Sequence, residues 1–388
     1  MAVAPGLTAR TGRAWDRFDG PRRLAGIDLA RGLAVIGMLA AHLLAIGPFS
    51  ADDPASWIDV VNGRSSILFA TLAGVSIALV TGATRPLTGS ARTRASGRIA
   101  LRGALLWAIG ILLVMTGVPV YVILPAYAVL FALSIPFLAL RARGLFLAAG
   151  LVAVVMPWVY PFLDAAPIWS GLGGDELAAF VGWAYPFPVW IAFLLAGMGL
   201  GRLDLRRVAV QVRVTAIGAA IAAIGYGGAA TFGSALADDP YLAAVGSAEA
   251  HSSGLGEVVG SGGFAFAVIG VCLLVCGTPL RWLVIPLRAV GSMPLTAYVL
   301  QIVVWAVFAA VMLGDTSDLV GVRDAGLFLP LTLGLVVGCT VWALLVGRGP
   351  LEALIDGIVR RVTGPPAARD AVPSPPTSRA RGAVRRPR

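Results

Sequence analysis

Residues 27–48 read IDLARGLAVIGMLAAHLLAIGP, an apolar run that contains one acid, one arginine and one histidine. A helix needs about 20 mostly apolar residues to cross the hydrocarbon core of a bilayer, and this run is long enough. Similar runs follow along the chain, and we expect about ten transmembrane helices, with a range of nine to eleven. They lie near 27–48, 65–84, 99–118, 119–140, 145–163, 183–201, 208–230, 255–277, 289–313 and 325–347. Residues 281–295 form an additional half-helix in one variant of this scheme. The predicted fold is an all-α, polytopic integral membrane protein.

The composition supports this class. Of the 388 residues, 58% are hydrophobic and only 13% are charged, with a mean hydropathy of +0.86. Soluble chains carry about 25% charged residues, so this chain has too little polar surface for a water-facing globule. The three cysteines, Cys272, Cys276 and Cys339, fall within predicted spans, so neither a disulfide framework nor a metal site is expected.

The distribution of charge predicts the orientation. All 30 basic residues are arginine, and the net charge is +10. Among the predicted loops, one set holds nearly all the arginines, while the other holds most of the acids and only Arg64 and Arg323. Positive residues concentrate in cytoplasmic loops, so both termini are expected in the cytoplasm. The positive charge then reports topology, and no nucleic-acid partner is expected.

Three regions follow from this map. Residues 1–26 form an arginine-rich cytoplasmic N-terminus without a cleavable signal peptide, and residues 27–347 form the transmembrane domain. Residues 348–388 are cytoplasmic, with an amphipathic helix over 350–363 and a disordered tail rich in proline and arginine. The arginines of the tail either contact anionic lipid headgroups or remain solvated.

The first predicted helix has a polar face. Arg31 and His42 are eleven residues apart, which places them within ~20° of each other on a helix and ~16 Å apart along its axis. Asp28 lies within ~40° of the same face and can pair with Arg31 at i, i+3. Ionisable groups inside a span are costly and usually functional. The alternative is a snorkelling arginine and a histidine hydrogen-bonded to a neighbouring helix.

Polar residues in other segments are also candidates. His251 stands before Ser252-Ser253 and Glu257 at the start of the eighth span, so it is either part of a substrate or orienting site or next to an ordinary serine N-cap. Arg64 can hold an anion or an acid such as Asp59.

The ninth span places Tyr298 and Gln301 at depth, after Pro294, which should start or kink the helix. Both polar residues are candidates for substrate binding. The alternative is that they join neighbouring helices by hydrogen bonds.

Four segments together carry a resemblance to a known family. They are Asp28-x-x-Arg31-Gly32, the spacing Arg31-x10-His42, Gly63-Arg64-Ser65-Ser66-Ile67-Leu68-Phe69, and Pro294-Leu295-Thr296-Ala297-Tyr298-Val299-Leu300-Gln301. The set resembles bacterial relatives of heparan-alpha-glucosaminide N-acetyltransferase, over roughly residues 25–347. The first-helix spacing is also similar to that of acyltransferase family three, a related group of transmembrane acyltransferases.

The resemblance implies a reaction and a location. Such proteins move an acetyl or short acyl group from cytoplasmic acyl-CoA, a cosubstrate and not a resident cofactor, to an extracytoplasmic saccharide or lipid-linked glycan. In this chain Arg31, oriented by Asp28, would anchor the CoA phosphates together with Arg98 and Arg102. His42 would act as general base or carry a transient acyl group. The implied setting is a bacterial plasma membrane, with lipids, acyl-CoA and the acceptor as partners and a homodimer as a possible assembly.

The chain departs from the animal enzyme at the catalytic histidine. That enzyme carries it in the first luminal loop, whereas residues 50–57 here contain no histidine. His42 must therefore serve from within its helix, or His251, beside Glu257, must reach in.

Two other classes of function stay open. A transporter or lipid flippase would use Asp28, Arg31 and His42 as a polar relay across the membrane. A non-catalytic membrane scaffold or sensor would have no such use for them. Binding of acetyl-CoA distinguishes an acyltransferase from both.

Overall fold

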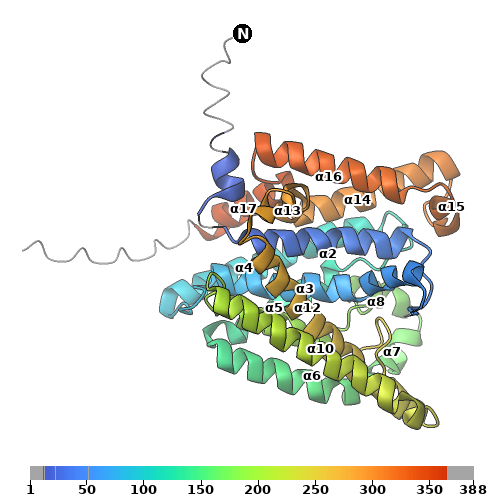
Figure 1. Cartoon of the computed structure of the whole chain (residues 1–388). Helices are drawn as coiled ribbons and strands as arrows, with labels where there is room; N and C mark the ends of the chain where they lie inside the picture. The colour runs from blue at the N-terminus through green and yellow to red at the C-terminus, as the bar shows by residue number, and fades with distance from the viewer. Residues whose placement is uncertain (1–11, 13, 22, 51, 365–388) are drawn as a thin grey trace, which may run out of the picture.

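The computed structural model describes residues 12, 14–21, 23–50 and 52–364, and its regular elements are all helices (Figure 1). The predicted all-α fold is thus confirmed. Eight helical segments within this part of the chain are long and apolar enough to cross a membrane. They are α2 (Ala25–Leu43), the segment Pro54–Val80 made of a 3-10 helix (Pro54–Val61) and α3 (Arg64–Val80), α4 (Gly89–Val114), α6 (Ala142–Asp164), α10 (Val208–Leu236), α12 (Leu255–Val275), α14 (Pro294–Phe308) with its π-helical extension Ala309–Leu313, and α16 (Phe328–Leu345).

Two predicted spans correspond to shorter apolar helices. The run 183–201 becomes α9 (Phe187–Gly201), which has 15 residues. The run 119–140 was predicted too long, because α5 (Leu124–Ser134) begins only at Leu124 and continues as a 3-10 turn, Ile135–Ala139. Pro125 explains this start, since a proline at the first helical turn needs no hydrogen-bond partner for its nitrogen.

Proline also divides the predicted span 289–313. A half-helix, α13 (Ile285–Ser292), ends at Met293, and Pro294 begins α14. This confirms both the additional half-helix and the expected effect of Pro294. At the other terminus, α17 (Pro350–Thr363) confirms the predicted amphipathic helix, whereas the tail beyond residue 364 lies outside the described residues.

The bundle has two chemically different ends. One end, which we call the arginine-rich end, carries residues 14–21, 23, 202–207, 279–288 and α17. The opposite, acidic end carries residues 52–62 and the short helices α7 (Pro167–Ser170), α8 (Gly174–Val181), α11 (Pro240–Gly246) and α15 (Leu319–Asp324) (Figure 1). This separation matches the predicted sorting of charge between loops.

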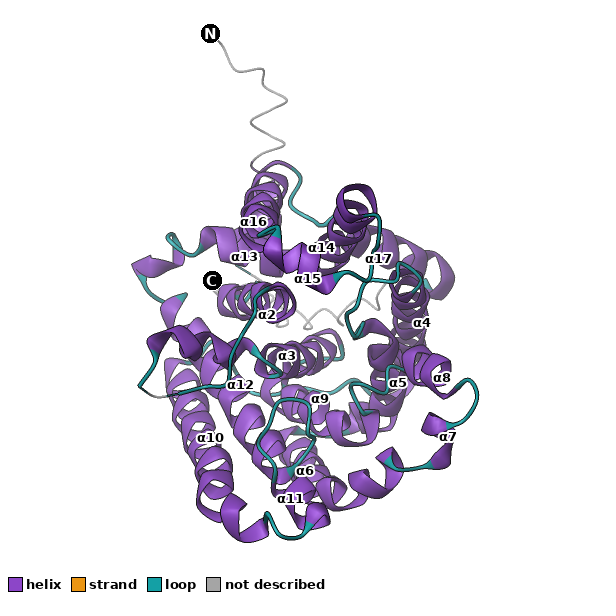
Figure 2. Ribbon diagram, turned by 90° about the vertical axis from the view of Figure 1, so that its right-hand side faces the viewer, coloured by secondary structure: helices purple, strands orange, loops and turns teal. Residues whose placement is uncertain are grey.

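Helices α2 and α3 occupy the centre of the bundle (Figure 2). In both spans 72% of the most apolar window is buried, against about a fifth in α4, α6, α10 and α16. Helix α2 packs against α13, α3 and α12, and α3 packs against α9. The polar residues of α2 therefore face protein and not lipid.

Residues before α2 also fold against the bundle. Residues 14–19 are helical, and Phe18 is completely buried beneath the guanidinium of Arg288. Asp19 forms ion pairs with Arg288 and Arg281. Part of the arginine-rich N-terminal region is thus tied to the transmembrane domain.

Glycine allows the closest helix contact, between α2 and α13. A Cβ atom at Gly291 would overlap the backbone oxygen of Asp28, which cannot move aside as a side chain would. We therefore expect Gly291→Ala to destabilise the protein by about 1–3 kcal/mol, as overpacking does. Thermal unfolding in detergent measures the effect. Gly334→Ala is the control, because its Cβ would meet nothing and alanine favours a helix; equal melting temperatures for the two variants would contradict the packing described.

Candidate active site

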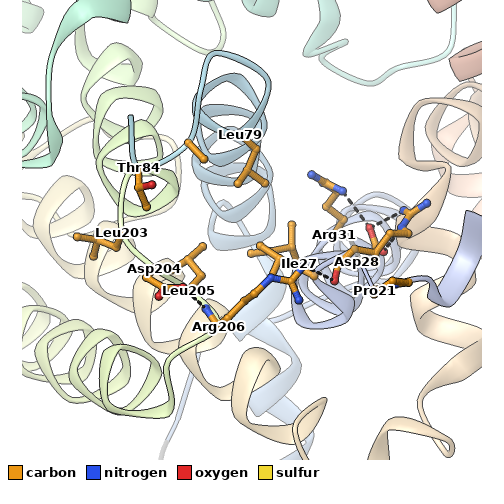
Figure 3. A pocket seen from close by; sticks show the side chains of 13 residues that line it. Pro21, Ile27, Asp28, Arg31, Leu79, Thr84, Leu203, Asp204, Leu205 and Arg206 are labelled. Carbon is orange, nitrogen blue, oxygen red and sulfur yellow. Dashed lines mark hydrogen bonds and ion pairs between the residues drawn. The ribbon is translucent and has the colours of Figure 1, made fainter. Parts of the chain in front are cut away.

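A buried cluster of charge lies near the arginine-rich end of α2. Asp28, only 3% exposed, accepts hydrogen bonds from Nε and Nη2 of Arg23, each at 2.9 Å, and from Nη1 of Arg31 at 3.1 Å. The predicted Asp28–Arg31 pair is confirmed (Figure 3). Nη2 of Arg31 also donates to the Ser76 hydroxyl on α3 at 2.7 Å. The Asp28 carboxylate thereby fixes the direction of the Arg31 guanidinium.

Arg23 was not predicted as a member of this cluster. Burial disfavours its charge, but the attraction of Asp28 and their hydrogen bonds outweigh this, and its pKa is raised. Two guanidinium groups therefore share one carboxylate, which leaves one positive charge in excess. Such a partly compensated cation pair can accept an anion.

Arg31 lines two cavities. A cavity of about 1100 Å³ opens at the arginine-rich end and is also lined by Arg23, Arg206 and Asp204 (Figure 3). A second cavity of about 150 Å³ begins at Arg31 and extends between α3, α4, α5 and α14 to Tyr298, with an almost wholly apolar lining. The first suits a large polar group, and the second suits a thin apolar chain.

Arg98 and Arg102, predicted to act with Arg31, line a different cavity of about 450 Å³ between α4 and α17. Arg98 donates to the hydroxyl of Thr363 and to the backbone oxygen of Gly364, and Arg102 pairs with Asp356. The structure thus gives both arginines partners on and after α17 and does not bring them to Arg31.

His42 occupies the last turn of α2, toward the acidic end. Its backbone oxygen accepts hydrogen bonds from Arg323 at 3.0 and 3.3 Å, whereas its imidazole has no hydrogen-bond partner in the described part of the chain. The ring is 6.3 Å from the indole ring of Trp305 and within electrostatic reach of His251 and Arg323. The two histidines are therefore brought to the same region, and the His42 imidazole is free to bind a ligand.

Unpartnered polar atoms face this region from α14. Gln301 and Trp305 are each 1% exposed, and both amide atoms of Gln301 and Nε1 of Trp305 lack partners among the described residues. A buried group without a hydrogen bond costs about 1–3 kcal/mol. The two residues are spaced i, i+4, so their side chains share one helix face. Trp305 was not predicted, although its spacing from Gln301 is a usable signal.

The other polar residues of α14 join elements, as the alternative interpretation expected. The Tyr298 hydroxyl accepts a hydrogen bond from the backbone N–H of Ile123 at 3.2 Å, and the Thr296 hydroxyl donates to Glu352 of α17 at 2.5 Å. Gln301 differs from them because its side-chain amide has no partner among the described residues. This difference separates a candidate binding residue from interhelical contacts.

His251 lies in a strained loop held by Glu257. The Glu257 carboxylate accepts hydrogen bonds from the backbone N–H of His251 at 2.6 Å and of Ser253 at 2.7 Å, and both residues have positive φ angles, 65° and 56°. Burial lowers the pKa of His251, so its imidazole is neutral near pH 7. The predicted serine N-cap is wrong: Gly254 caps α12 without a side-chain hydrogen bond, and the N–H of Glu257 in the first turn donates to the backbone oxygen of Ser247 at 3.0 Å.

Arg64 has a structural set of partners. It donates from Nε to the Tyr226 hydroxyl at 2.8 Å and lies 3.6 Å from the Asp59 carboxylate, the acid that the sequence suggested. Tyr226 in turn bonds to Ser261 at 2.7 Å, so these residues connect α3, α10 and α12 beside Glu257.

The fold and this site define a multi-pass membrane protein whose central helix carries ionisable residues near both of its ends. A family model described as "Heparan-alpha-glucosaminide N-acetyltransferase, catalytic" matches residues 23–231, more than half of the chain. The chain belongs to this family. A second family model, "Protein of unknown function (DUF418)", matches residues 206–361. No curated protein matches the chain.

Proposed function

We propose that this protein is a plasma-membrane acyltransferase with ten spans and both termini in the cytoplasm. It would transfer an acetyl or short acyl group from cytoplasmic acyl-CoA to a saccharide or lipid-linked glycan on the other side. One observation carries the proposal: α2 has a partly buried cation that lines two cavities near one end and an imidazole without a described hydrogen-bond partner near the other. Family membership supports the acetyl group.

The donor would bind along α2 from the arginine-rich end. Its phosphates would sit in the 1100 Å³ cavity against Arg31 and Arg23, with Asp28 orienting both guanidinium groups. The thin pantetheine arm would follow the 150 Å³ cavity past Tyr298. Arg31 and His42 are ~16 Å apart along the helix, a distance that such an extended arm spans. The cavity of Arg98 and Arg102 is a second candidate for the phosphates, less favoured because α17 already partners both residues.

The reaction would take place between His42 and α14. His42 would remove a proton from the acceptor amine or hydroxyl as its nitrogen or oxygen attacks the thioester carbon. Nε2 of Gln301 and Nε1 of Trp305, both unpartnered, would donate hydrogen bonds to the resulting oxyanion. Collapse would break the carbon–sulfur bond and release CoA thiolate, which takes the proton from His42.

His251 and its surroundings would shape the acceptor side. Glu257 acts as a positioning residue, since its two oxygens already accept the backbone N–H groups of the His251 loop. His251, neutral and near His42, is the second candidate for the base. Arg64 would stabilise the acceptor side of the site through its hydrogen bond to Tyr226.

Binding of acetyl-CoA tests the proposal. We expect the purified protein to bind acetyl-CoA and Arg31→Gln to weaken binding about 10- to 100-fold, because a charged hydrogen bond contributes about 1.5–3 kcal/mol. Calorimetric titration in detergent measures the dissociation constant for acetyl-CoA. Arg207→Gln is the matched control, since Arg207 is exposed and does not line the cavity. If the wild-type protein does not bind acetyl-CoA, the transporter and scaffold alternatives replace the acyltransferase.

A further inference from the structure

A separate apolar cavity of about 560 Å³ lies between α6, α9, α10 and α12. Small residues form much of its wall, among them Ala149, Gly150, Ala196 and Gly262, so the space exists because side chains are missing there. Arg213 is the one charged residue that lines it. None of the residues assigned above to acyl transfer lines this cavity.

The arrangement of helices decides from which side the cavity is reached. Helix α6 packs against α9 and α10 packs against α12, but α6 and α10 have no extensive contact with each other (Figure 2). At the acidic end α11 closes the gap between them: the Tyr241 hydroxyl donates to the backbone oxygen of Trp158 at 2.8 Å, and its ring lies 5.2 Å from that of Phe162. Entry is thus lateral, between α6 and α10, and toward the arginine-rich end.

Arg213 marks that end of the cavity. It lies in the second turn of α10, its side chain is exposed, and it has no ion pair or hydrogen bond with any described residue. A long arginine side chain near the end of a membrane helix extends its charge toward the interface, where phosphate groups lie. Arg213 is thus placed to bind an anion at the membrane surface.

The length of the cavity fits one leaflet. Its lining on α10 runs from Val210 to Ile221, a rise of ~16 Å, about half of the ~30 Å hydrocarbon core. We propose that this cavity binds one phospholipid from the leaflet at the arginine-rich end, with one acyl chain between α6 and α10 and the phosphate on Arg213. The site is independent of acyl transfer.

Native mass spectrometry of the full-length protein in detergent tests this site with two probes, phosphatidylglycerol and a diacylglycerol with the same chains. The cavity is filled by Gly150→Leu/Gly262→Leu, because a Cβ at Gly150 meets nothing and one at Gly262 only the Phe193 ring at 3.5 Å. The matched control is Gly334→Leu/Gly338→Leu on α16, where a Cβ also meets nothing. Arg213→Gln tests the phosphate contact at an exposed position that folding does not require.

We expect one tightly bound phosphatidylglycerol in the wild type and the control, and at least tenfold weaker binding in Gly150→Leu/Gly262→Leu. Arg213→Gln should weaken the binding of phosphatidylglycerol about fivefold, which is the effect of one arginine near a phosphate surface. The binding of diacylglycerol should stay unchanged. Wild-type binding no stronger than that of the cavity-filled variant would overturn the site. Equal phosphatidylglycerol binding by Arg213→Gln and the wild type would overturn the assignment of the phosphate.

Discussion

His42→Ala is expected to lower the rate of acyl transfer about 10²- to 10⁴-fold, the usual contribution of a positioned general base. The nitrogens of the His42 imidazole have no hydrogen-bond partner in the described part of the chain, and the ring lies beside the unpartnered Nε1 of Trp305. Acetyl-CoA binding should change little, because the phosphate cavity and Arg31 are ~16 Å away along α2. Rate and binding constant are to be measured on the same purified samples.

His251→Ala is the matched comparison for His42→Ala. Because His251 is proposed to shape the acceptor side and not to remove the proton, its loss should lower the rate of acyl transfer less than tenfold. Full activity of His42→Ala, or a greater loss in His251→Ala, would remove His42 as the base and assign that role to His251.

Gln301→Leu is expected to lower kcat about 10²- to 10³-fold, the range observed when one oxyanion donor is removed. The KM for acetyl-CoA should stay nearly constant, since the contact forms in the transition state. The free energy of unfolding should stay constant or rise, because leucine removes two buried polar atoms that have no partner.

The combination of lower kcat and undiminished stability distinguishes this role from a structural one. A glutamine that joins helices would lose stability on substitution and affect the rate only through folding. Trp305→Phe offers a second measurement, since it keeps the ring beside His42 and removes only the Nε1 donor. If Gln301→Leu melts lower and retains full kcat, Gln301 has no part in transfer.

Local features of the sequence predicted much of the fold. The apolar runs and the i, i+3 spacing of Asp28 and Arg31 depend only on neighbouring residues. The ion pair is confirmed, and eight of the ten predicted runs correspond to segments long and apolar enough to cross a membrane. The effect of Pro294 is local as well and was predicted, whereas the effect of Pro125 on the start of α5 was not.

Features of the site that depend on tertiary contact could not be predicted. In the sequence, Arg98 and Arg31 are both arginines near the cytoplasmic end of a predicted span. Only the packing of α17 against α4 places them in different cavities. The predicted serine N-cap was wrong because the loop folds so that Gly254 takes the cap position and the Ser247 backbone oxygen accepts the N–H of Glu257. The position of Trp305 beside His42 results from the packing of α14 against α2, which the sequence does not show.

Acetyl transfer across the membrane tests the central claim most directly. The protein is reconstituted in vesicles with its arginine-rich end outward, acetyl-CoA is added outside, and glucosamine is enclosed within. The account predicts N-acetylglucosamine inside the vesicles in step with free CoA outside, and loss of both with His42→Ala. Equal CoA release by wild-type and His42→Ala vesicles, or none by either, would contradict it.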